Sequence, residues 1–440
     1  MAISHVVSHH SFWRSAGGVL LKFFASGAML GTLLLMLPAS RQQDLPLLDI
    51  FFTAVSAITV TGLITVDTGS SYSWLGQVVI ALLIQAGGLG YMLIGTITLL
   101  GKDKFVSLRR QSALGVTVQI NDGLSLFSLI RFVSAFSLIL ISVLTLALAI
   151  FWIPAYGWGE GLGKAAFHAV SAFNNAGFAL FPDSLMSAAG GQPVLYVHAL
   201  GFILGGIGFT VIYEIAQGSR LSIHTRIMIY GSIFLLGTGT LGLLLFEAGN
   251  DSLGAGSERL SHAFFQAATT RTAGFNSVDI ASMSNASHVF MMINMVIGAG
   301  PGSTAGGLRL TTFVLLVAGL TAALQGRQTT RLLGRTLQVE NLLRASGILI
   351  LTLALLSVIN LMILALEPEL DAMALIFEMV SALGTVGLSL GITSSLGAPA
   401  KLLVITVMMI GKVSPVILFG ALTGRRGSPL RYAGGEIATG

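Results

Sequence analysis

Four short segments of this chain share one pattern, in which a Phe precedes a Gly by ten positions and a long apolar stretch lies on either side. They read FTAVSAITVTGL, FHAVSAFNNAGF, FFQAATTRTAGF and FEMVSALGTVGL. The paired positions are Phe52 and Gly62, Phe167 and Gly177, Phe264 and Gly274, and Phe377 and Gly387. A small residue lies six positions before each Gly: Ser56, Ser171, Ala268 and Ser381. Four ungapped copies indicate an architecture built from one repeated unit.

The stretches between these segments are apolar enough to lie in a membrane. Of the 440 residues, 54% are hydrophobic and only 9% are charged, whereas about a quarter of the residues of a soluble protein are charged. A helix needs about 20 apolar residues to cross the hydrocarbon core. Eight stretches qualify: Gly17 to Leu37, Trp74 to Leu100, Phe127 to Phe151, Val194 to Ile215, Met228 to Phe246, Val289 to Leu324, Gly347 to Leu366 and Leu402 to Leu422. We expect a multi-pass protein of the cell membrane.

Basic residues follow every even-numbered stretch. They are Lys102, Lys104, Arg109, Arg110, Arg220, Arg226, Arg327, Arg331, Arg335, Arg425, Arg426 and Arg431. Acidic residues gather in the opposite loops: Asp44, Asp49, Asp67, Glu160, Asp183, Glu247, Asp251, Glu258, Asp279, Glu367, Glu369 and Asp371. Because cytoplasmic loops carry the excess of Lys and Arg, both termini are predicted to be cytoplasmic. This topology accounts for the net charge of +5 without a nucleic-acid partner.

Each Phe-to-Gly segment falls between an odd and an even stretch, and its helical part of about a dozen residues is too short to cross the bilayer. The predicted fold is an all-α polytopic membrane protein of four tandem span/pore-helix/span units, with eight transmembrane helices and four re-entrant pore loops around one central pore. The units are 17–100, 124–216, 222–324 with a broken second span, and 341–424. In the simpler alternative, Phe and Gly only help apolar helices to pack. The shared place of all four copies in the topology argues against it.

The four turns have the chemistry of a cation filter. A permeating cation exchanges its water shell for rings of backbone carbonyls, and Gly tolerates the positive φ that such a strand requires. Non-helical backbone at membrane depth must be buried in protein or face water. The C-terminal ends of the short helices carry partial negative charge, which favours cations. The predicted filter residues are Val60, Thr61, Gly62, Asn175, Ala176, Gly177, Thr272, Ala273, Gly274, Thr385, Val386 and Gly387.

The sixth stretch contains a segment that cannot remain helical. Between Gly298 and Gly307 lie five Gly and one Pro, which make a continuous helix costly. The segment predicts an unwound loop at membrane depth beneath the filter. A phosphate-binding loop would need a Gly-Lys-Ser/Thr ending, which is missing here; a kink without function is the other alternative.

Several ionisable residues lie inside apolar or filter segments. Lys412 is central in the last stretch, where a Lys costs roughly 2.5 to 3.5 kcal/mol on insertion scales. We expect Lys412 to bind carbonyls of the unwound loop and to add an electrostatic barrier below the filter; the alternative is a structural pair with Glu378. Arg271 is expected to brace the filter from behind, and His168 and His262 to be packing or interfacial residues.

The sequence shows no group of residues with the pattern of a catalytic site. The chain has no cysteine and therefore no thiolate ligand or nucleophile. Its eight His residues show no paired ligand spacing, which argues against a metal site. No Ser nucleophile motif or carboxylate dyad stands out, so the chain is not expected to be an enzyme.

The four repeats and eight stretches together resemble the Ktr/Trk/HKT superfamily of potassium transporters over nearly the whole chain, most closely its KtrB-type membrane subunits. Thr385-Val386-Gly387 resembles the start of the potassium-channel filter sequence, and Gly at all four filter positions implies potassium as the ion. The segment Gly302 to Gly307 is similar to the family's gating loop, with Arg309 where a Lys is common. The implied gate residues are Gly298, Gly300, Gly302, Ser303, Thr304, Gly306, Gly307 and Lys412, the last where the family has an Arg.

The resemblance implies potassium uptake through a gated pore. It further implies a homodimer in the lipid bilayer and a cytosolic ring of nucleotide-binding RCK subunits. It allows sodium as an activating ion, which the sequence does not establish. Two other hypotheses remain open: a coupled secondary transporter with alternating access, and a membrane scaffold or sensor that does not conduct.

Overall fold

The protein is described from a computed structural model that covers residues 16–100, 126–218, 221–304, 306–327 and 329–413. The α-helices are α2 (Ala16–Leu35), α3 (Leu47–Thr59), α4 (Thr68–Ser71), α5 (Trp74–Leu100), α7 (Leu126–Tyr156), α8 (Trp158–Phe173), α9 (Gly191–Gly206), α10 (Phe209–Ala216), α11 (Ile223–Phe246), α12 (Gly256–Thr269), α13 (Asn285–Val296), α14 (Leu310–Leu324), α15 (Val339–Leu366), α16 (Ala372–Gly384) and α17 (Ala398–Val413). Four single 3-10 turns are η1 (Pro38–Ser40), η2 (Asp251–Leu253), η3 (Ile280–Ser282) and η4 (Thr393–Ser395), and one hairpin pairs β1 (Arg331–Leu332) with β2 (Arg335–Thr336). The two termini, the basic residues 102–110, Arg220 and everything after Val413 lie outside the described ranges.

The first helix of each predicted unit is long, apolar and exposed to the surroundings. Within the described residues, α2, α7, α11 and α15 are the four single helices long and apolar enough to cross a membrane. Large apolar side chains such as Leu33, Leu146, Phe234 and Leu361 are about two-thirds exposed on these helices. Such continuous apolar surface would be unfavourable in water and suits contact with lipid tails.

The fourth apolar stretch, predicted as a span from Val194 to Ile215, is not one continuous helix. Helix α9 ends at Gly206 and α10 starts at Phe209, with a bend of 92° between them. Gly208 has φ of +101°, which a helix cannot accommodate. The peptide groups freed by the bend are satisfied from elsewhere: the Gly300 N–H donates to Gly206 O at 3.0 Å, and the Phe209 N–H donates to Gly302 O at 3.2 Å.

The sixth stretch is interrupted where the Gly-rich sequence predicts it. Helices α13 and α14 are separated by residues 297–309, which we call the α13–α14 loop. Ile297 and Leu308 form a parallel bridge at its base. Of the eight expected spans, the sixth of them predicted to be broken, length and composition support four in the described part of the chain, or five if α9 and α10 count as one. The last stretch is described only as far as Val413.

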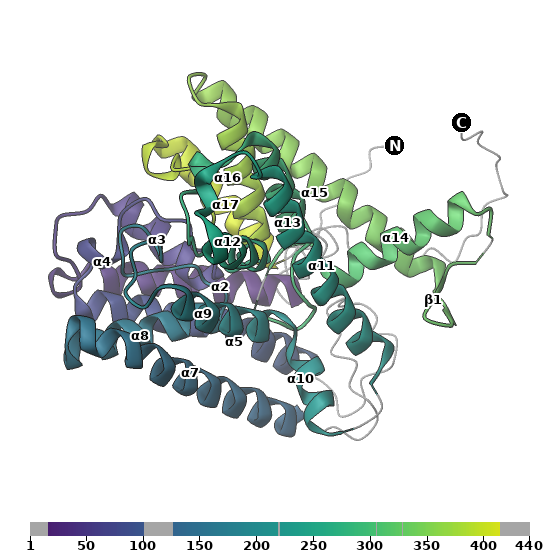
Figure 1. Cartoon of the computed structure of the whole chain (residues 1–440), viewed down its shortest axis with the longest axis horizontal. Coiled ribbons are helices and arrows are strands. Elements are labelled where there is room, and N and C mark those ends of the chain that lie inside the picture. Colours follow the sequence, from purple (N-terminus) through teal and green to yellow (C-terminus); the bar gives the residue numbers. More distant parts are fainter. Residues whose placement is uncertain (1–15, 101–125, 219–220, 305, 328, 414–440) are drawn as a thin grey trace, which may run out of the picture.

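The second helices of the four units link the short helices α3, α8, α12 and α16 in a closed cycle. The second helix of each predicted unit contacts the short helix of the next: α5 contacts α8, α9 contacts α12, α13 contacts α16, and α17 returns to α3. In Figure 1 the long helices α7 and α15 lie at opposite edges of the bundle. The short helices are thereby enclosed by protein, and Phe52 and Phe377 within them are fully buried.

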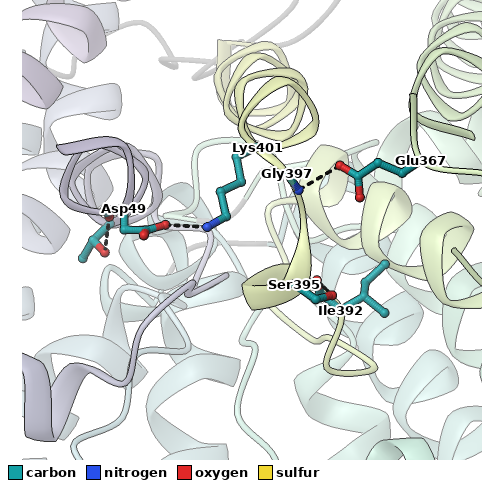
Figure 2. Close-up of polar contacts among 7 residues, drawn as sticks. Asp49, Glu367, Ile392, Ser395, Gly397 and Lys401 are labelled. Atoms are coloured by element: carbon teal, nitrogen blue, oxygen red, sulfur yellow. Dashed lines mark hydrogen bonds and ion pairs between the residues drawn. The ribbon is translucent and has the colours of Figure 1, made fainter. Parts of the chain in front are cut away.

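One ion pair closes the cycle between the last helix and the first short helix. Lys401 on α17 donates to Asp49 Oδ1 in the first turn of α3 at 2.7 Å, and Figure 2 shows the two side chains reaching toward each other. Both side chains are about nine-tenths buried. Close by, Glu367 Oε1 accepts the Gly397 N–H at 2.8 Å and fixes the start of α17 (Figure 2).

Candidate functional site

All four short helices end in the same unusual backbone conformation. The residue two positions before each repeat glycine has positive φ: 56° at Val60, 59° at Asn175, 73° at Thr272 and 48° at Thr385. Positive φ is uncommon for any residue with a β-carbon and is a marked outlier for β-branched residues. Backbone of this kind persists only where the surrounding structure imposes it, and it clusters at functional sites.

The four repeat glycines lie together and form what we call the glycine ring: Gly62, Gly177, Gly274 and Gly387. Their φ values are +93°, +70°, +81° and +92°. A β-carbon on any of them would collide with the carbonyl oxygen that precedes the glycine of the next repeat. The distances from such a β-carbon are 2.3 Å from Gly62 to Ala176 O, 2.9 Å from Gly177 to Ala273 O, 2.3 Å from Gly274 to Val386 O and 2.2 Å from Gly387 to Thr61 O. The contacts therefore run once around the four repeats in chain order and return to the first.

Hydroxyl groups of the short helices bind the backbone N–H groups of the ring. Ser56 Oγ accepts the Gly62 N–H at 3.1 Å, and Ser381 Oγ accepts the Gly387 N–H at 3.0 Å. In the third repeat, Thr269 Oγ1 accepts the Phe275 N–H at 2.9 Å instead. The sequence identifies Ser56 and Ser381 as small residues of the repeat, but their role as hydrogen-bond acceptors becomes visible only in the structure.

The second helices of three repeats also approach the ring through glycines that the sequence analysis missed. A β-carbon on these glycines would overlap the backbone of the short helix four residues before the ring glycine. The distances are 1.8 Å from Gly87 to Ile58 O, 1.9 Å from Gly205 to Phe173 O and 2.2 Å from Gly411 to Leu383 O. Each of the three lies at a similar distance along the chain after its ring glycine, which is the signal that could have identified them. Their contacts let the helices hold the turns tightly.

A cavity of about 450 Å³ opens on one side of the glycine ring, and all four ring glycines line it. Three carboxylates also line it, those of Asp67, Asp183 and Asp279. These belong to the acidic loops that are predicted from the sequence to lie on the outer side. Acidic side chains around a cleft raise the local concentration of cations, so the electrostatics of this cavity favour a positively charged ion.

The α13–α14 loop contacts the ring segments through Thr304. Thr304 Oγ1 donates to Asn175 Oδ1 at 3.1 Å, and Lys412 Nζ donates to Thr304 O at 2.6 Å. Gly306 lies so close to Thr385 that a β-carbon would come within 2.1 Å of its Oγ1. The loop thus lies against the short-helix ends of the second and fourth repeats, and Lys412 is connected to Asn175 through one residue.

Lys412 is 1% exposed, and its position answers one alternative from the sequence. The ion pairs between described residues are Lys164 with Glu160 and Lys401 with Asp49, so Lys412 is not paired with Glu378. Glu378 instead accepts a hydrogen bond from the Thr393 hydroxyl. The expected hydrogen bond from Lys412 to a loop carbonyl is present, whereas its role as a barrier remains a prediction.

Two more expectations concern residues around the ring. Arg271 is buried and its Nη2 donates to Ser232 Oγ on α11 at 3.1 Å, a position between the third turn and the long helix behind it. Arg309 stands at the position where the sequence resemblance suggests a Lys. Its Nη1 donates to Gly300 O at 3.3 Å, so this side chain also binds the α13–α14 loop.

Apolar helices around a ring of strained glycine turns define a multi-pass helical membrane protein of the transporter class. The sequence model of the TrkH family, described as cation transport proteins, matches residues 19–424. The chain is 37% identical over 418 residues to the Ktr system potassium uptake protein B of Bacillus subtilis, covering 94% of each chain. It is 36% identical over 443 residues to the protein of the same name from Vibrio alginolyticus, covering 97% of this chain and 96% of the relative.

The fold has a solved counterpart. The crystal structure of the potassium transporter TrkH from Vibrio parahaemolyticus superposes with a TM-score of 0.74 at 19% identity, covering 96% of this chain and 86% of that one. This chain belongs to the TrkH family of cation transport proteins.

Proposed function

We propose that this protein takes up potassium through a gated pore whose selectivity filter is the glycine ring. The closed order of contacts among the four ring glycines and the four preceding carbonyl oxygens carries the proposal. Carbonyl rings can replace the hydration shell of a cation, and a ring made from four repeats surrounds a single axis. The filter consists of twelve residues, namely each ring glycine and the two residues that precede it in the chain, from Val60 to Gly62 in the first repeat to Thr385 to Gly387 in the fourth.

Two electrostatic features support a cation as the permeating species. The short helices end at the filter, so the negative ends of their dipoles lie near the ring. The outer cavity adds the carboxylates of Asp67, Asp183 and Asp279. Potassium as the particular ion is supported by the names of the relatives, both of which are potassium uptake proteins.

The α13–α14 loop is the proposed gate. It is held by Lys412 through Thr304, and its Gly298, Gly300, Gly302, Ser303, Gly306 and Gly307 provide the small, backbone-rich surface that lies against the turns. A positive charge buried beneath the ring opposes the passage of a cation. The gate opens in this proposal when the loop and Lys412 separate from Asn175.

The eight-span arrangement in the four units 17–100, 124–216, 222–324 and 341–424, with both termini cytoplasmic, completes the proposal. The cyclic contacts of the short helices support it. Because relatives are named as parts of a Ktr system, we extend the proposal to a homodimer that binds a cytosolic RCK ring. Sodium activation belongs to the same extension.

Cation flux into liposomes tests the filter. We expect wild-type protein to pass potassium in preference to sodium, and Gly62→Ser to lose at least tenfold of that discrimination because its side chain would meet Ala176 O. Gly237→Ser on α11, where a β-carbon meets nothing within 4 Å, is the matched control and should retain it. Selectivity unchanged in Gly62→Ser would refute the filter.

The same assay separates the two other hypotheses. A coupled transporter, which the breaks in α9–α10 and α13–α14 favour, predicts flux that depends on a second ion's gradient with fixed stoichiometry. A scaffold predicts no potassium flux with or without a cytosolic partner. Flux that follows the potassium gradient alone supports the pore.

A further inference from the structure

One position of the repeat carries buried polar groups that the filter itself does not use. Nine residues before each ring glycine lie Thr53, His168, Phe265 and Glu378. His168 and Glu378 are both 0% exposed, and they belong to the second and fourth repeats, which are not neighbours in the cyclic order. Burying such groups is costly unless they are hydrogen-bonded. Their hydrogen-bond partners therefore indicate which part of the structure these residues hold in place.

His168 is bonded to the strand that leaves the second turn. Its Nε2 accepts the N–H of Leu180, three residues after Gly177, at 3.0 Å. Its Nδ1 lies 3.3 Å from Nε2 of His198 on α9, whose own Nδ1 lies 2.8 Å from Val194 O. A carbonyl only accepts, so neutral His198 carries its proton on Nδ1 and accepts at Nε2. His168 must then donate from Nδ1, which leaves Nε2 free to accept from Leu180. Every member of this chain of hydrogen bonds has one consistent role.

Glu378 makes the corresponding contact in the fourth repeat. Its Oε1 accepts a hydrogen bond from the hydroxyl of Thr393, six residues after Gly387. Thr393 in turn lies 3.2 Å from Ser389 Oγ, and both hydroxyl residues line the outer cavity. The carboxyl group therefore connects the interior of α16 to the segment that forms the cavity wall directly beyond the ring.

At this position the other two repeats show, among the described residues, no hydrogen bond to the strand directly after the turn. Thr53 Oγ1 donates to Asp49 O of its own helix at 2.9 Å, and Phe265 has no polar group to offer. Gln266, the neighbour of Phe265, reaches Ser277 Oγ only at 3.4 Å, which is long for a hydrogen bond. The strong connections thus occur on one diagonal of the ring.

We propose that His168 and Glu378 are positioning residues that fix the outer strands of the second and fourth turns and thereby the ion selectivity of the ring. The inference rests on the proposed function. A residue in a strained turn keeps its geometry only if its surroundings impose it. The hydroxyls of Ser56 and Ser381 bind the N–H groups of ring glycines, and Thr269 binds the N–H of the next residue in its repeat. His168 and Glu378 instead hold the segments that follow the ring glycines. Neither residue contacts the ion path directly.

Potassium and sodium flux into liposomes, measured per folded protein, tests the fourth-repeat brace. We expect Glu378→Leu, which removes the acceptor, to lower potassium-to-sodium discrimination at least tenfold. Glu378→Gln keeps an acceptor oxygen and should stay within about threefold of wild type. Thr393→Val should reproduce the Leu effect, and the double variant should be no worse than either single one. Thr53→Val, at the same repeat position but bonded to its own helix, is the matched control and should leave selectivity unchanged.

The second repeat gives an independent arm that does not rely on Glu378 variants folding. His168→Phe keeps the ring packing and removes the acceptor for Leu180, so selectivity should fall. His168→Gln places an oxygen near the former Nε2 and should restore it in part. Unchanged discrimination in Thr393→Val and His168→Phe overturns the proposal, as does an equal loss in Glu378→Gln and Glu378→Leu. If wild-type protein itself shows no potassium-selective flux, the proposed function fails as well; selective wild type with unchanged variants refutes only the braces.

Discussion

Lys401 Nζ lies 2.7 Å from Asp49 Oδ1, and this ion pair joins the last described helix to the first short helix. The two residues are far apart in sequence, so the pair spans the seam where the cycle of repeats closes. Asp49 lies in the first turn of α3, where a negative charge is also favoured by the helix dipole. Both side chains are largely buried, which makes the pair less screened than a surface contact.

We predict that Asp49→Asn or Lys401→Met lowers the stability of the purified protein. Loss of one partner leaves a charge in a poorly solvated place, so the cost should exceed the ~0.2–1 kcal/mol of an exposed pair. Thermal unfolding in detergent with a double-mutant cycle measures the coupling. The Lys164–Glu160 pair on α8, in which the Glu160 side chain is 63% exposed, is the matched control. A coupling at Asp49–Lys401 no larger than in that control contradicts the prediction.

Lys412→Gln should increase potassium flux. The substitution removes a buried positive charge beneath the ring and shortens the side chain that holds Thr304 O. A hydrogen bond to a charged group contributes ~1.5–3 kcal/mol, so release of the loop corresponds to about a 10- to 150-fold change in the closed-to-open ratio. Liposome flux per folded protein is the measurement. Flux that is unchanged or lower at normal protein yield argues against Lys412 as a barrier.

Stability should fall below about pH 4.5 because of Glu247, which follows α11 and is fully buried. Burial by itself raises the pKa of Glu247, but hydrogen bonds from Ser287, Ser252 and Ser284 outweigh it and bring the pKa below its ordinary value of 4.5. A lowered folded-state pKa stabilises the protein above the ordinary value. That stabilisation is lost as the pH falls through the lowered pKa, because the unfolded state then binds the proton first.

Thermal unfolding between pH 7 and pH 3 checks this expectation. Glu247→Gln should be less stable than wild type at pH 7 and should lose less stability on acidification. Glu258→Gln, at an exposed position on the neighbouring α12, is the comparison for general acid effects. Parallel pH curves for wild type and Glu247→Gln would show that the carboxylate is not responsible.

The predicted orientation can be tested by labelling single introduced cysteines, because the chain itself has no cysteine. Ser187→Cys and Gln325→Cys both introduce a thiol at an exposed position, on the predicted outer and cytoplasmic sides. A membrane-impermeant maleimide applied to intact cells should label only Ser187→Cys, and permeabilised cells should label both. Labelling of Gln325→Cys in intact cells would reverse the topology.

Much of the candidate site follows from local sequence. The repeated spacing of Phe and Gly predicted four equivalent turns. In the structure, the residue two positions before each ring glycine has the same left-handed backbone conformation. The Gly-rich segment from Gly298 predicted an interrupted helix, since neither Gly nor Pro favours helical backbone. These features depend on residues within one segment, so their physics is visible without knowledge of the rest of the chain.

Other features could not be predicted because they depend on contacts between distant segments. The break between α9 and α10 falls at Gly205-Gly206-Ile207-Gly208, whose glycines allow a bend. Only the docking of Gly300 and Gly302 supplies the hydrogen bonds that make the break acceptable. The roles of Ser56 and Ser381 as acceptors likewise depend on the path of the turn. From the sequence, His168 is interpreted as a packing residue. Its role as an acceptor for the Leu180 N–H is visible only in the structure.

The sequence by itself determined a membrane protein of four equivalent short helices and glycine turns, because apolar length, periodicity and the positive φ of glycine are local properties. Only the tertiary structure decided that the turns close into one ring in chain order and that Lys412 binds Thr304 rather than Glu378. It also decided that Asp49 and Lys401 close the cycle. The reason is physical: desolvation and hydrogen-bond geometry select partners in three dimensions, and residues hundreds of positions apart carry no local signal of the pairing.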